Sequence, residues 1–483
     1  MQISVSNFKG IGELPFFSLK KINVLAGANS GGKSSLIHLL LLIKQSIEAR
    51  STNTPLKLNK PYISLGRFEN IISKQSNKKE LSFGLYLLPN ELTPRLRSML
   101  PSKGRLGNKN LSLDGFRGIK IKVSFRKPTE KIVVSAFELT IDAVTSFYLN
   151  LTRSANGKSY ELTTNGFEFF FLMHGSEFKD DFQGKHITAK CSVSFISFLP
   201  DYIELTDEKF SGVDNNFIFN NQLRISINKF FSKISYLGPL RDEPREFYYQ
   251  DDDFVDSIGT KGENAAFILA KHAEDIIKYR RLSEDGKFTS EVSGNLIQAV
   301  NYWLCDVFGL AKSITVKRAK ANRNMYTIEL KNNFGNMIPI THVGFGVSQV
   351  FPILVEGLRQ YSGNQLIILE QPEIHLHPKV QAALFDFVNS SNGNISFLIE
   401  THSDHFINRL RRRVAECVNE AVISDINLTF VNRDFNNVSY EELAINEVGS
   451  FDYWPEGFFD QYDEDLRAIV LAQSLKRKNN KIK

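Results

Sequence analysis

Residues 22–35 decide the fold, and they read Ile22-Asn-Val-Leu-Ala-Gly27-Ala-Asn-Ser-Gly-Gly-Lys33-Ser-Ser35. The apolar start predicts a short buried strand, and the apolar run 36–43 predicts a helix after the glycine loop. The loop satisfies the pattern G-x-x-x-x-G-K-[ST], in which backbone N–H groups wrap closely around a triphosphate. Side chains at positions 31 and 32 would obstruct that approach. The segment therefore predicts a nucleotide-binding P-loop, with a chance glycine turn as the alternative.

Each position of this loop has a predicted role. Lys33 would reach the β and γ phosphates, and the Ser34 hydroxyl would bind Mg²⁺. The helix that begins near Ser34 would place the positive end of its dipole beneath the phosphates. Asn29 and Ser30 are assigned to the same site, although both are also common turn formers. The predicted ATP-binding residues of this segment are Gly27, Asn29, Ser30, Gly31, Gly32, Lys33, Ser34 and Ser35.

A second group of polar residues lies far downstream, where two apolar runs each end in a carboxylate. The run 365–369 ends in Glu370, and the run 395–399 ends in Glu400, which His402 follows. This spacing fits one β-α-β unit, and neighbouring parallel strands place their carboxyl ends at one edge of the sheet. Glu370 is therefore expected beside the phosphates as a ligand of the Mg²⁺ shell. A polar residue that follows the second strand is well placed to sense the γ-phosphate.

With these motifs the chain resembles ABC-type ATPases of the SMC, RecF and OLD group. Within that group it is similar to the short-headed AAA-family ATPases of bacterial antiphage systems of the Septu and PARIS kind. The resemblance covers residues 1–70 and 230–465. Besides the P-loop, it is carried by Val5-Ser-Asn-Phe8-Lys9-Gly10, Tyr236-Leu-Gly238-Pro239-Leu-Arg241, Gly344-Phe-Gly346-Val-Ser348-Gln349, Glu370-Gln-Pro-Glu373-Ile-His-Leu-His377-Pro, Thr401-His402-Ser and Trp454-Pro-Glu-Gly-Phe458-Phe459.

The resemblance implies a head that binds ATP and Mg²⁺. Glu370 would stand at the metal, and His402 would be the switch histidine that contacts the γ-phosphate. A signature segment would cap the nucleotide of a second copy, so that ATP closes a homodimer or a larger homo-oligomer. The candidate signature residues are Gly344, Gly346, Ser348 and Gln349. Which of Gly346 and Ser348 would touch the γ-phosphate stays open.

The chain departs from the family pattern at the acid that activates the attacking water. The usual Asp-Glu-Pro is Glu370-Gln371-Pro372 here. A glutamine can orient a water molecule but cannot take its proton. Glu373 is the candidate substitute, and a solvated turn residue is an equally open interpretation. Gln371, Glu373 and His402 are thus the predicted catalytic residues, and the expected activity is slow ATP hydrolysis.

The remaining sequence divides by its hydrophobic pattern. Apolar residues at every second position, as in 119–125, predict an antiparallel β subdomain, whereas 264–281 and 294–309 have helical spacing. The predicted fold class is α/β, a P-loop NTPase of the ABC-head type with a mixed or parallel sheet flanked by helices, an inserted β-rich subdomain and a helical subdomain. The predicted parts are 1–75 with the P-loop, 76–230 with the β-rich insert, 231–340 as the helical linking region, 341–440 with the signature, metal carboxylate and switch histidine, and 441–483 with an aromatic motif and a basic tail.

The composition is that of a full-sized globular protein. Hydrophobic residues at 42% and charged residues at 23% argue against disorder and fibrous repeats. The three cysteines lack the spacing of a zinc site or a disulfide framework. A run of about 18 uncharged apolar residues, the length that spans a membrane, is absent. We therefore expect a cytoplasmic protein without a membrane partner.

Charged runs receive separate interpretations. The basic segment 91–127 contains ten Lys and Arg, and over 91–130 these stand against three acids, a local excess of seven compared with a net charge of +6 for the whole chain. Such a segment can follow a DNA backbone in a salt-dependent manner, with a solvated surface as the alternative. The arginines between 409 and 413 are expected to solvate one face of a helix.

The leading functional hypothesis is an ATP-driven sensor subunit that controls a separate effector nuclease in an antiphage complex. The sequence contains no HExxH, GxSxG or clustered Asp-x-Asp motif. The 81 residues after His402 are also too few for the nuclease domain that OLD enzymes carry. A RecF-like DNA-binding repair or replication ATPase is the main alternative. A transporter ATPase subunit and a nucleotide-binding scaffold without turnover, which Gln371 would suit, are further alternatives.

Overall fold

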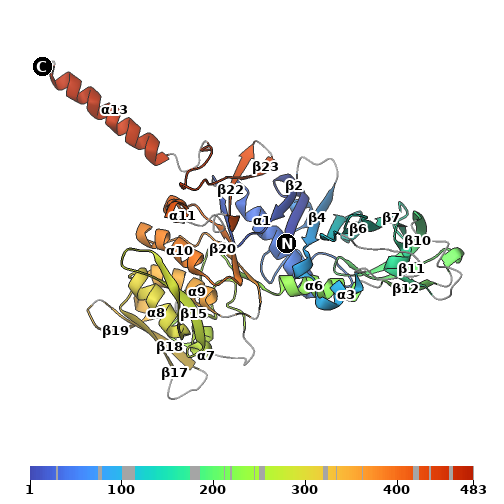
Figure 1. The fold of residues 1–483 in the computed structure, drawn as a ribbon, viewed down its shortest axis with the longest axis horizontal. Helices are drawn as coiled ribbons and strands as arrows, with labels where there is room; N and C mark the ends of the chain where they lie inside the picture. The colour runs from blue at the N-terminus through green and yellow to red at the C-terminus, as the bar shows by residue number, and fades with distance from the viewer. Residues whose placement is uncertain are drawn as a thin grey trace. The chain divides into compact units, whose positions relative to one another are not determined.

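The computed structural model describes residues 1–28, 31–73, 79–100, 115–173, 185–210, 213–217, 220–243, 245–249, 256–318, 325–332, 334–359, 361, 363–416, 424–434, 437–455 and 461–481. The chain forms two compact units (Figure 1). The first unit comprises Met1–Leu19, Ser34–Ile234 and Arg433–Ser439. The second comprises Lys20–Lys33, Ser235–Asn432 and Tyr440–Lys483.

An antiparallel sheet of nine strands dominates the first unit, in the order β11-β10-β8-β7-β6-β5-β4-β1-β2. The strands of this unit are β1 (Gln2–Phe8), β2 (Ile11–Ser18), β4 (Glu80–Leu87), β5 (Gly118–Arg126), β6 (Val133–Asp142), β7 (Phe147–Arg153), β8 (Tyr160–Thr164), β9 (Phe171–Met173), β10 (Ile187–Ile196), β11 (Leu199–Leu205) and β12 (Val213–Phe217). Its helices are α1 (Lys33–Ala49), α2 (Phe68–Ile71), η1 (Pro89–Glu91), α3 (Pro94–Met99), α4 (Phe167–Phe170), η2 (Glu208–Phe210) and α6 (Asn220–Phe231).

The period-two pattern of β5 gives a strand with one buried, apolar face, as predicted. Its four apolar residues between 119 and 125 are buried, whereas Lys122 is exposed. On the buried face, Phe125 stacks on Phe83 with ring centroids 5.3 Å apart, and Phe198 meets Phe83 edge-on at 5.0 Å. The antiparallel strands also differ from the expectation in one respect. They do not form an inserted sheet of their own, because β4 pairs with β1 and extends the N-terminal hairpin.

The second unit is built on a six-stranded sheet in the order β13-β20-β21-β3-β22-β23. The strands of this unit are β3 (Ile22–Ala26), β13 (Ile234–Leu237), β14 (Tyr248–Tyr249), β15 (Ile276–Leu282), β16 (Phe288–Asn295), β17 (Ser313–Arg318), β18 (Met325–Lys331), β19 (Met337–Pro339), β20 (Gln365–Glu370), β21 (Ile395–Glu400), β22 (Ile426–Asp434) and β23 (Asn437–Glu442). Its helices are α7 (Ala265–His272), α8 (Leu296–Asn301), the π-helical turn η3 (Tyr302–Val307), η4 (Ile340–His342), α9 (Phe345–Leu358), α10 (Pro378–Ser390), α11 (Asp404–Glu416) and α13 (Gln461–Lys481).

The centre of this sheet is parallel and buried. β20, β21, β3 and β22 pair in parallel, and every residue of β3 and β20 is buried. Continuous apolar strands of this kind are typical of parallel sheets covered by helices on both faces. Aromatic contacts join the helices in the core, with Trp303 edge-on to Phe387 at 5.3 Å and Phe385 edge-on to Phe406 at 5.3 Å. The predicted α/β P-loop NTPase fold class is confirmed.

One predicted helix is wrong in its second half. Residues 264–281 form α7 only as far as His272, and the chain then continues as β15 in a hairpin with β16. In β15, Ile277 and Tyr279 are buried while Lys278 and Arg280 are exposed. This alternation has the period of a strand, and it outweighs the helical spacing of the residues before it. The prediction for 294–309 is confirmed by α8 and η3.

Arg409, Arg411 and Arg413 of α11 do not solvate a helix face as predicted, whereas Arg412 is exposed. Arg409 and Arg413 both pair with Asp386, a fully buried residue of α10, and the Arg413 Nε lies 2.6 Å from its Oδ1. Arg411 lies over the ring of Trp454 with a separation of 5.2 Å. These arginines therefore hold α11 in place, because a buried carboxylate requires paired cations. Among the described helices, none is both long enough and apolar enough to cross a membrane.

Candidate nucleotide-binding site

Three neighbouring parallel strands of the second unit end at one edge of the sheet. Glu370, the last residue of β20, is paired in register with Glu400, the last residue of β21. Glu400 is in turn paired with Leu25 of β3, one strand further along. Ligands of open parallel sheets bind at the carboxyl ends of the strands. The segments that follow β3, β20 and β21 therefore form the candidate site.

The P-loop leaves β3 through a glycine that the surrounding backbone requires. Gly27 has φ +142°, and a Cβ there would lie 2.3 Å from the carbonyl oxygen of Val431 in β22. A Cβ at Gly31 would lie 3.0 Å from that same oxygen. The Tyr440 hydroxyl donates to the carbonyl of Gly32 over 2.8 Å. Larger residues at Gly27 or Gly31 would therefore push the loop away from β22. The predicted residues Asn29 and Ser30 lie outside the described residues.

Lys33 is folded into the site rather than exposed. Its side chain is buried, and its Nζ donates to the carbonyl oxygens of Gly27 at 3.0 Å and of Ala28 at 2.7 Å. Burial lowers the pKa of Lys33, and the carboxylates of Glu400 and Glu373 oppose that shift. The lysine is thus a buried cation between its own loop and two acids. The predicted residues Ser34 and Ser35 follow it in the first turn of α1.

Glu373 and His402 are in direct contact. Glu373 is buried, and its Oε1 accepts the backbone N–H of His402 at 2.5 Å. Burial raises the pKa of Glu373, and the nearby charge of Glu400 raises it further. Burial and the charge of Lys33 lower the pKa of His402 to about 4. The imidazole is therefore neutral at pH 7, so it can donate one hydrogen bond and accept another.

The chain turns sharply between Glu370 and Glu373. Glu370 is buried, and its Oε1 accepts a hydrogen bond from the Tyr236 hydroxyl at 3.3 Å. Burial and Glu370 both raise the pKa of Tyr236, so the phenol stays a donor. Gln371 has φ +44°, which is uncommon for a residue with a Cβ, and its N–H donates to the Glu400 carbonyl at 2.8 Å. Strained backbone of this kind concentrates at functional sites.

The predicted signature lies at the start of a helix beside this turn. Gly344 is the N-cap residue of α9, and Ser348 and Gln349 are buried in the following turn. A Cβ at Gly346 would lie 3.7 Å from Leu376 and 3.9 Å from the His375 carbonyl oxygen. The structure thus places the signature against the loop after β20. Its contact with the nucleotide of a second copy stays a prediction.

His377, in the loop after β20, has a structural role at the start of α10. The Nδ1 of His377 accepts the N–H of Lys379 at 3.2 Å, so that His377 caps α10 ahead of Pro378. Pro at the first helical position and an acceptor at the cap are common at helix starts. Among the described residues, no group of three or more His, Cys, Asp or Glu is arranged to hold a metal ion. His377 is therefore engaged at the start of α10.

Sequence reasoning did not assign Glu400, Tyr440 or Arg241 to the site. Glu400 was visible as the acid that ends an apolar strand, which is the same signal that identified Glu370. Arg241 ends one of the segments on which the family resemblance rests, but its spacing from the other motifs does not indicate a role in the site. Tyr440 gave no signal, because its contact with the P-loop depends on the path of β23.

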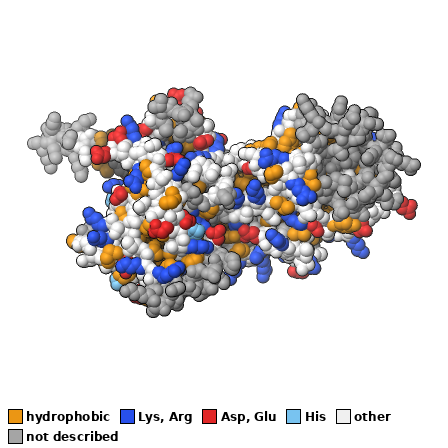
Figure 2. Space-filling view, turned by 60° about the horizontal axis from the view of Figure 1, so that its bottom comes forward, with side chains coloured by type: hydrophobic (Ala, Val, Ile, Leu, Met, Phe, Trp, Pro, Cys, Tyr) orange, Lys and Arg blue, Asp and Glu red, His pale blue; other side chains and the backbone are white. Residues whose placement is uncertain are grey.

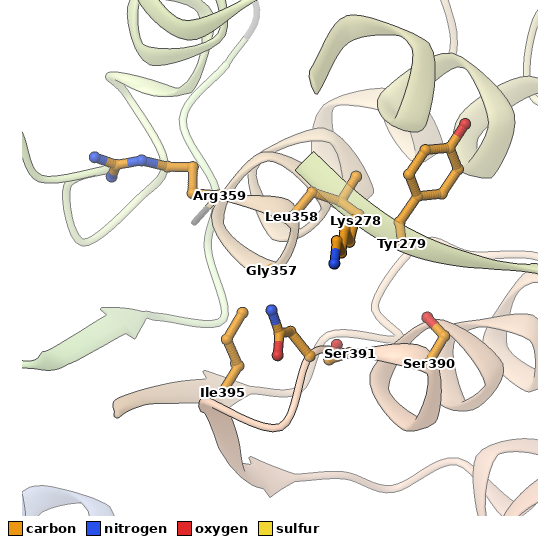
Figure 3. A pocket seen from close by; sticks show the side chains of 9 residues that line it. Lys278, Tyr279, Gly357, Leu358, Arg359, Ser390, Ser391 and Ile395 are labelled. Atoms are coloured by element: carbon orange, nitrogen blue, oxygen red, sulfur yellow. The ribbon is translucent and has the colours of Figure 1, made fainter. Parts of the chain in front are cut away.

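A small cavity of about 20 Å³ lies elsewhere in the second unit, with room for about one water molecule (Figure 3). Lys278 and Tyr279 of β15 line it together with Ile395, and the Arg359 side chain points away from it. Ile395 begins β21, whereas Glu400 ends that strand. The cavity is therefore at the opposite end of β21 from the candidate site.

A comparison with protein families identifies the chain. The family model described as "AAA domain, putative AbiEii toxin, Type IV TA system" matches residues 22–408. The chain belongs to this AAA domain family. The AAA domain match begins at the first residue of β3 and ends beyond His402, so it contains the whole candidate site. The chain is thus a member of a P-loop ATPase family.

The remaining comparisons concern a second family model, the curated proteins and the solved structures. A second family model, described as a protein of unknown function (DUF3696), matches residues 423–469. No curated protein matches the sequence. Among solved structures, an SMC head bound to the C-terminal winged-helix domain of ScpA has a TM-score of 0.40 and 10% identity, over 92% of this chain and 97% of that one. The SMC head domain of Thermotoga maritima has a TM-score of 0.37 and 9% identity, over 92% and 98%. An Smc head with an extended coiled coil, bound to the C-terminal domain of ScpA and derived from Pyrococcus furiosus, has a TM-score of 0.38 and 10% identity, over 92% and 96%.

Proposed function

We propose that this AAA-family chain is a slow ATPase whose ATP-bound form closes two copies around the nucleotide. We further propose that it is the sensor subunit of a bacterial antiphage complex and controls a separate effector nuclease. The observation that carries the proposal is the meeting of Lys33, Glu373 and His402 at the carboxyl edge of one parallel sheet. This arrangement joins a phosphate-binding cation, a candidate base and a neutral hydrogen-bonding imidazole.

The residues fit a magnesium-bound triphosphate. Lys33 is held against loop carbonyls, from which its ammonium group can turn to phosphate oxygens. The Ser34 hydroxyl and the Glu370 carboxylate are hard oxygen donors, which Mg²⁺ prefers. When bound, Mg²⁺ would neutralise phosphate charge. The assignment of Ser34 and Glu370 as metal residues stays part of the proposal.

Slow hydrolysis follows from the state of the candidate base. Gln371 stands where the related ATPases have an acid, and an amide cannot take a proton from water. Glu373 can take it, but one of its oxygens already accepts the His402 N–H. Its raised pKa makes it a stronger base and also increases the fraction that is protonated. We therefore propose that Glu373 accepts the proton and that Gln371 and His402 orient the reacting groups.

The proposed dimer uses the signature at the start of α9. Gly344 is exposed at the N-cap and presents the first N–H groups of that helix. If Gly344, Gly346, Ser348 and Gln349 bind the phosphates of a second copy, ATP stabilises the closed dimer. Hydrolysis then returns the population to the open form. Such a cycle suits a sensor, because nucleotide state determines assembly.

Two observations bear on the partners. The family description names a toxin of a type IV toxin–antitoxin system, which supports a role in defence. In the basic segment 91–127, Lys120 pairs with Asp142 and Lys127 pairs with Glu69, each at 2.8 Å. On the face shown in Figure 2, Lys and Arg side chains are interspersed with Asp and Glu side chains. Residues 101–114 of the segment lie outside the described residues. For the described part, these pairings favour the effector proposal over direct DNA binding, for which the segment remains the candidate surface.

A reconstituted complex tests the proposal. The protein is co-expressed with the product of the adjacent reading frame, and nuclease activity of the purified material is measured with Mg²⁺-ATP and with Mg²⁺-ADP. We expect a stable complex whose nuclease activity depends on which nucleotide is present. If the isolated ATPase instead binds DNA in a salt-dependent manner and no complex forms, the RecF-like alternative is correct.

A further inference from the structure

Arg241 is a buried cation whose guanidinium meets no hydrogen-bond partner in the part of the chain that the structure describes. It is 7% exposed, and none of its three guanidinium nitrogens has a partner among the described residues. A guanidinium carries five N–H donors, and burying it without acceptors is costly. Buried arginines are normally paired with carboxylates or other acceptors. Its position therefore calls for a ligand that supplies those acceptors.

The loop that carries Arg241 lies beside the candidate site. It follows β13, which neighbours β20 in the sheet. Tyr236 of β13 reaches Glu370 at the end of β20, whereas Ser235 accepts from the Gln365 side chain at its start, over 3.1 Å. The chain therefore leaves β13 at the same edge of the sheet where β20 ends.

The backbone on both sides of Arg241 is fixed. The Gly238 N–H donates to the Thr260 carbonyl at 2.8 Å, and the Asp242 N–H donates to the Lys261 carbonyl at 2.9 Å. A Cβ at Gly238 would lie 3.1 Å from the Tyr236 hydroxyl, so the turn is tight as well as hydrogen-bonded. The backbone that carries Arg241 is thus held in place before any ligand arrives, which lowers the entropic cost of binding.

The charges around Arg241 place it in the same site as Lys33. Burial lowers the pKa of Arg241 to about 10, and Tyr236, Glu370 and Glu373 oppose that shift. The side chain remains a cation at neutral pH. The Glu373 carboxylate also acts on the pKa of Lys33. Two buried cations therefore share one acidic neighbour.

We propose that Arg241 binds the terminal phosphate of the nucleotide held by Lys33 and so distinguishes a nucleoside triphosphate from a diphosphate. The inference rests on the proposed nucleotide site and adds a positioning residue to it. A planar guanidinium matches the oxygens of a phosphate group in a bidentate manner. The terminal phosphate supplies the acceptors that the protein does not.

The segment 260–262, which holds the Arg241 loop through its backbone, also contacts the helix of the signature. Gly262, next to Lys261, has φ +76°, and a Cβ there would lie 2.4 Å from the Cβ of Pro352 in α9. The segment 260–262 therefore links the backbone beside Arg241 to Pro352 of α9. Arg241 can thus report the presence of a triphosphate to the surface that is proposed to meet the second copy.

The test replaces Arg241 by Met, which keeps the apolar stem and removes the charge. Binding of Mg²⁺-ADP and of a non-hydrolysable Mg²⁺-ATP analogue is measured by calorimetry. We expect the analogue to bind about 10- to 100-fold more weakly and ADP to be nearly unaffected, because one charge-assisted contact is lost. Arg241→Lys should recover part of the difference. Arg245→Met is the matched control, since Arg245 is exposed in the same loop and pairs with Asp242.

Thermal unfolding separates this role from a structural one. Removing an unpaired buried charge should leave the melting temperature of the nucleotide-free protein unchanged or higher. A lower melting temperature together with unchanged nucleotide discrimination would show that Arg241 is structural. An equal loss of ADP and analogue affinity would overturn the terminal-phosphate assignment. If the unmodified protein and Lys33→Ala bind nucleotide alike, the proposed site itself is wrong, and the inference fails with it.

Discussion

The buried carboxyl group of Glu373 accepts a backbone N–H and lies near two other charged groups of the site. Glu373→Gln keeps the shape of the side chain but removes the group that can take a proton. We expect ATP turnover to fall about 100-fold or more, the usual range for a lost general base, while nucleotide binding persists. Phosphate release under steady-state conditions measures this, and Glu291→Gln on exposed β16 is the control. Unchanged turnover would exclude Glu373 from catalysis.

The neutral imidazole of His402 makes stability depend on pH. Its pKa is about 4 in the folded protein, against 6.5 for an ordinary histidine. Between these two pH values His402 is protonated in the unfolded chain but neutral in the folded protein. The free energy of unfolding therefore falls as the pH is lowered through this range. His402→Gln should therefore lose less stability than the unmodified protein between pH 7 and about pH 4. Urea denaturation at several pH values measures the difference.

His38 complicates that measurement, because its pKa is also lowered to about 4, by burial and by Lys9. His38→Gln is therefore measured in parallel, and the two variants should each remove part of the pH dependence. An unchanged pH dependence in His402→Gln would show that the imidazole is not held neutral by burial and Lys33.

At the scale of secondary structure, α10 and α11 are held together by a buried carboxylate. Asp386 pairs with both Arg409 and Arg413. Asp386→Ala leaves two arginines without their acid, and we expect a loss of about 3–5 kcal/mol in the free energy of unfolding. Glu416→Ala is the matched control, since Glu416 pairs with arginines of the same helix but is more exposed and should cost about 1 kcal/mol or less. Equal losses in urea denaturation would contradict this account.

The elements that could be predicted from sequence are those with a single dominant pattern. β3, β20 and β21 are continuous apolar runs, and each is followed by a polar motif, so their places in a parallel sheet follow from local rules. The helix predicted over residues 276–281 was wrong because an apolar helix precedes them, and the alternation of exposed and buried residues that marks a strand begins only after His272. The prediction that Arg409 and Arg413 of α11 face solvent was wrong because their partner, Asp386, lies on a different helix.

The candidate site was predictable to a similar extent. Lys33 was assigned from the P-loop pattern, and Glu370 and His402 from their positions at strand ends. The structure brings Lys33 and His402 close enough to perturb the pKa of His402. Arg241 could not be assigned, because its burial depends on the fixed turn at 260–261. The contact between Glu373 and His402 likewise depends on the path of two loops and not on sequence spacing.

At the scale of the whole molecule, the account depends on assembly through the signature. Gly344 is exposed, and a Cβ there would meet no atom within 4 Å, so the folded monomer tolerates a side chain. Gly344→Glu should leave the melting temperature unchanged but abolish nucleotide-dependent dimers, because a carboxylate would face phosphates. Gly393→Glu, at another exposed glycine with open space, is the control. Normal dimers in Gly344→Glu, measured by light scattering, would remove this segment from the interface.

The mass of the Glu373→Gln protein in solution reports on dimer formation around ATP, since slow turnover preserves the ATP-bound form. Sedimentation is measured with Mg²⁺-ATP and with Mg²⁺-ADP, and again after adding Lys33→Ala to the same chain. The account predicts a species of at least twice the 54.9 kDa chain mass with ATP, and the single chain with ADP or with the lysine replaced. The same mass under all of these conditions would contradict it.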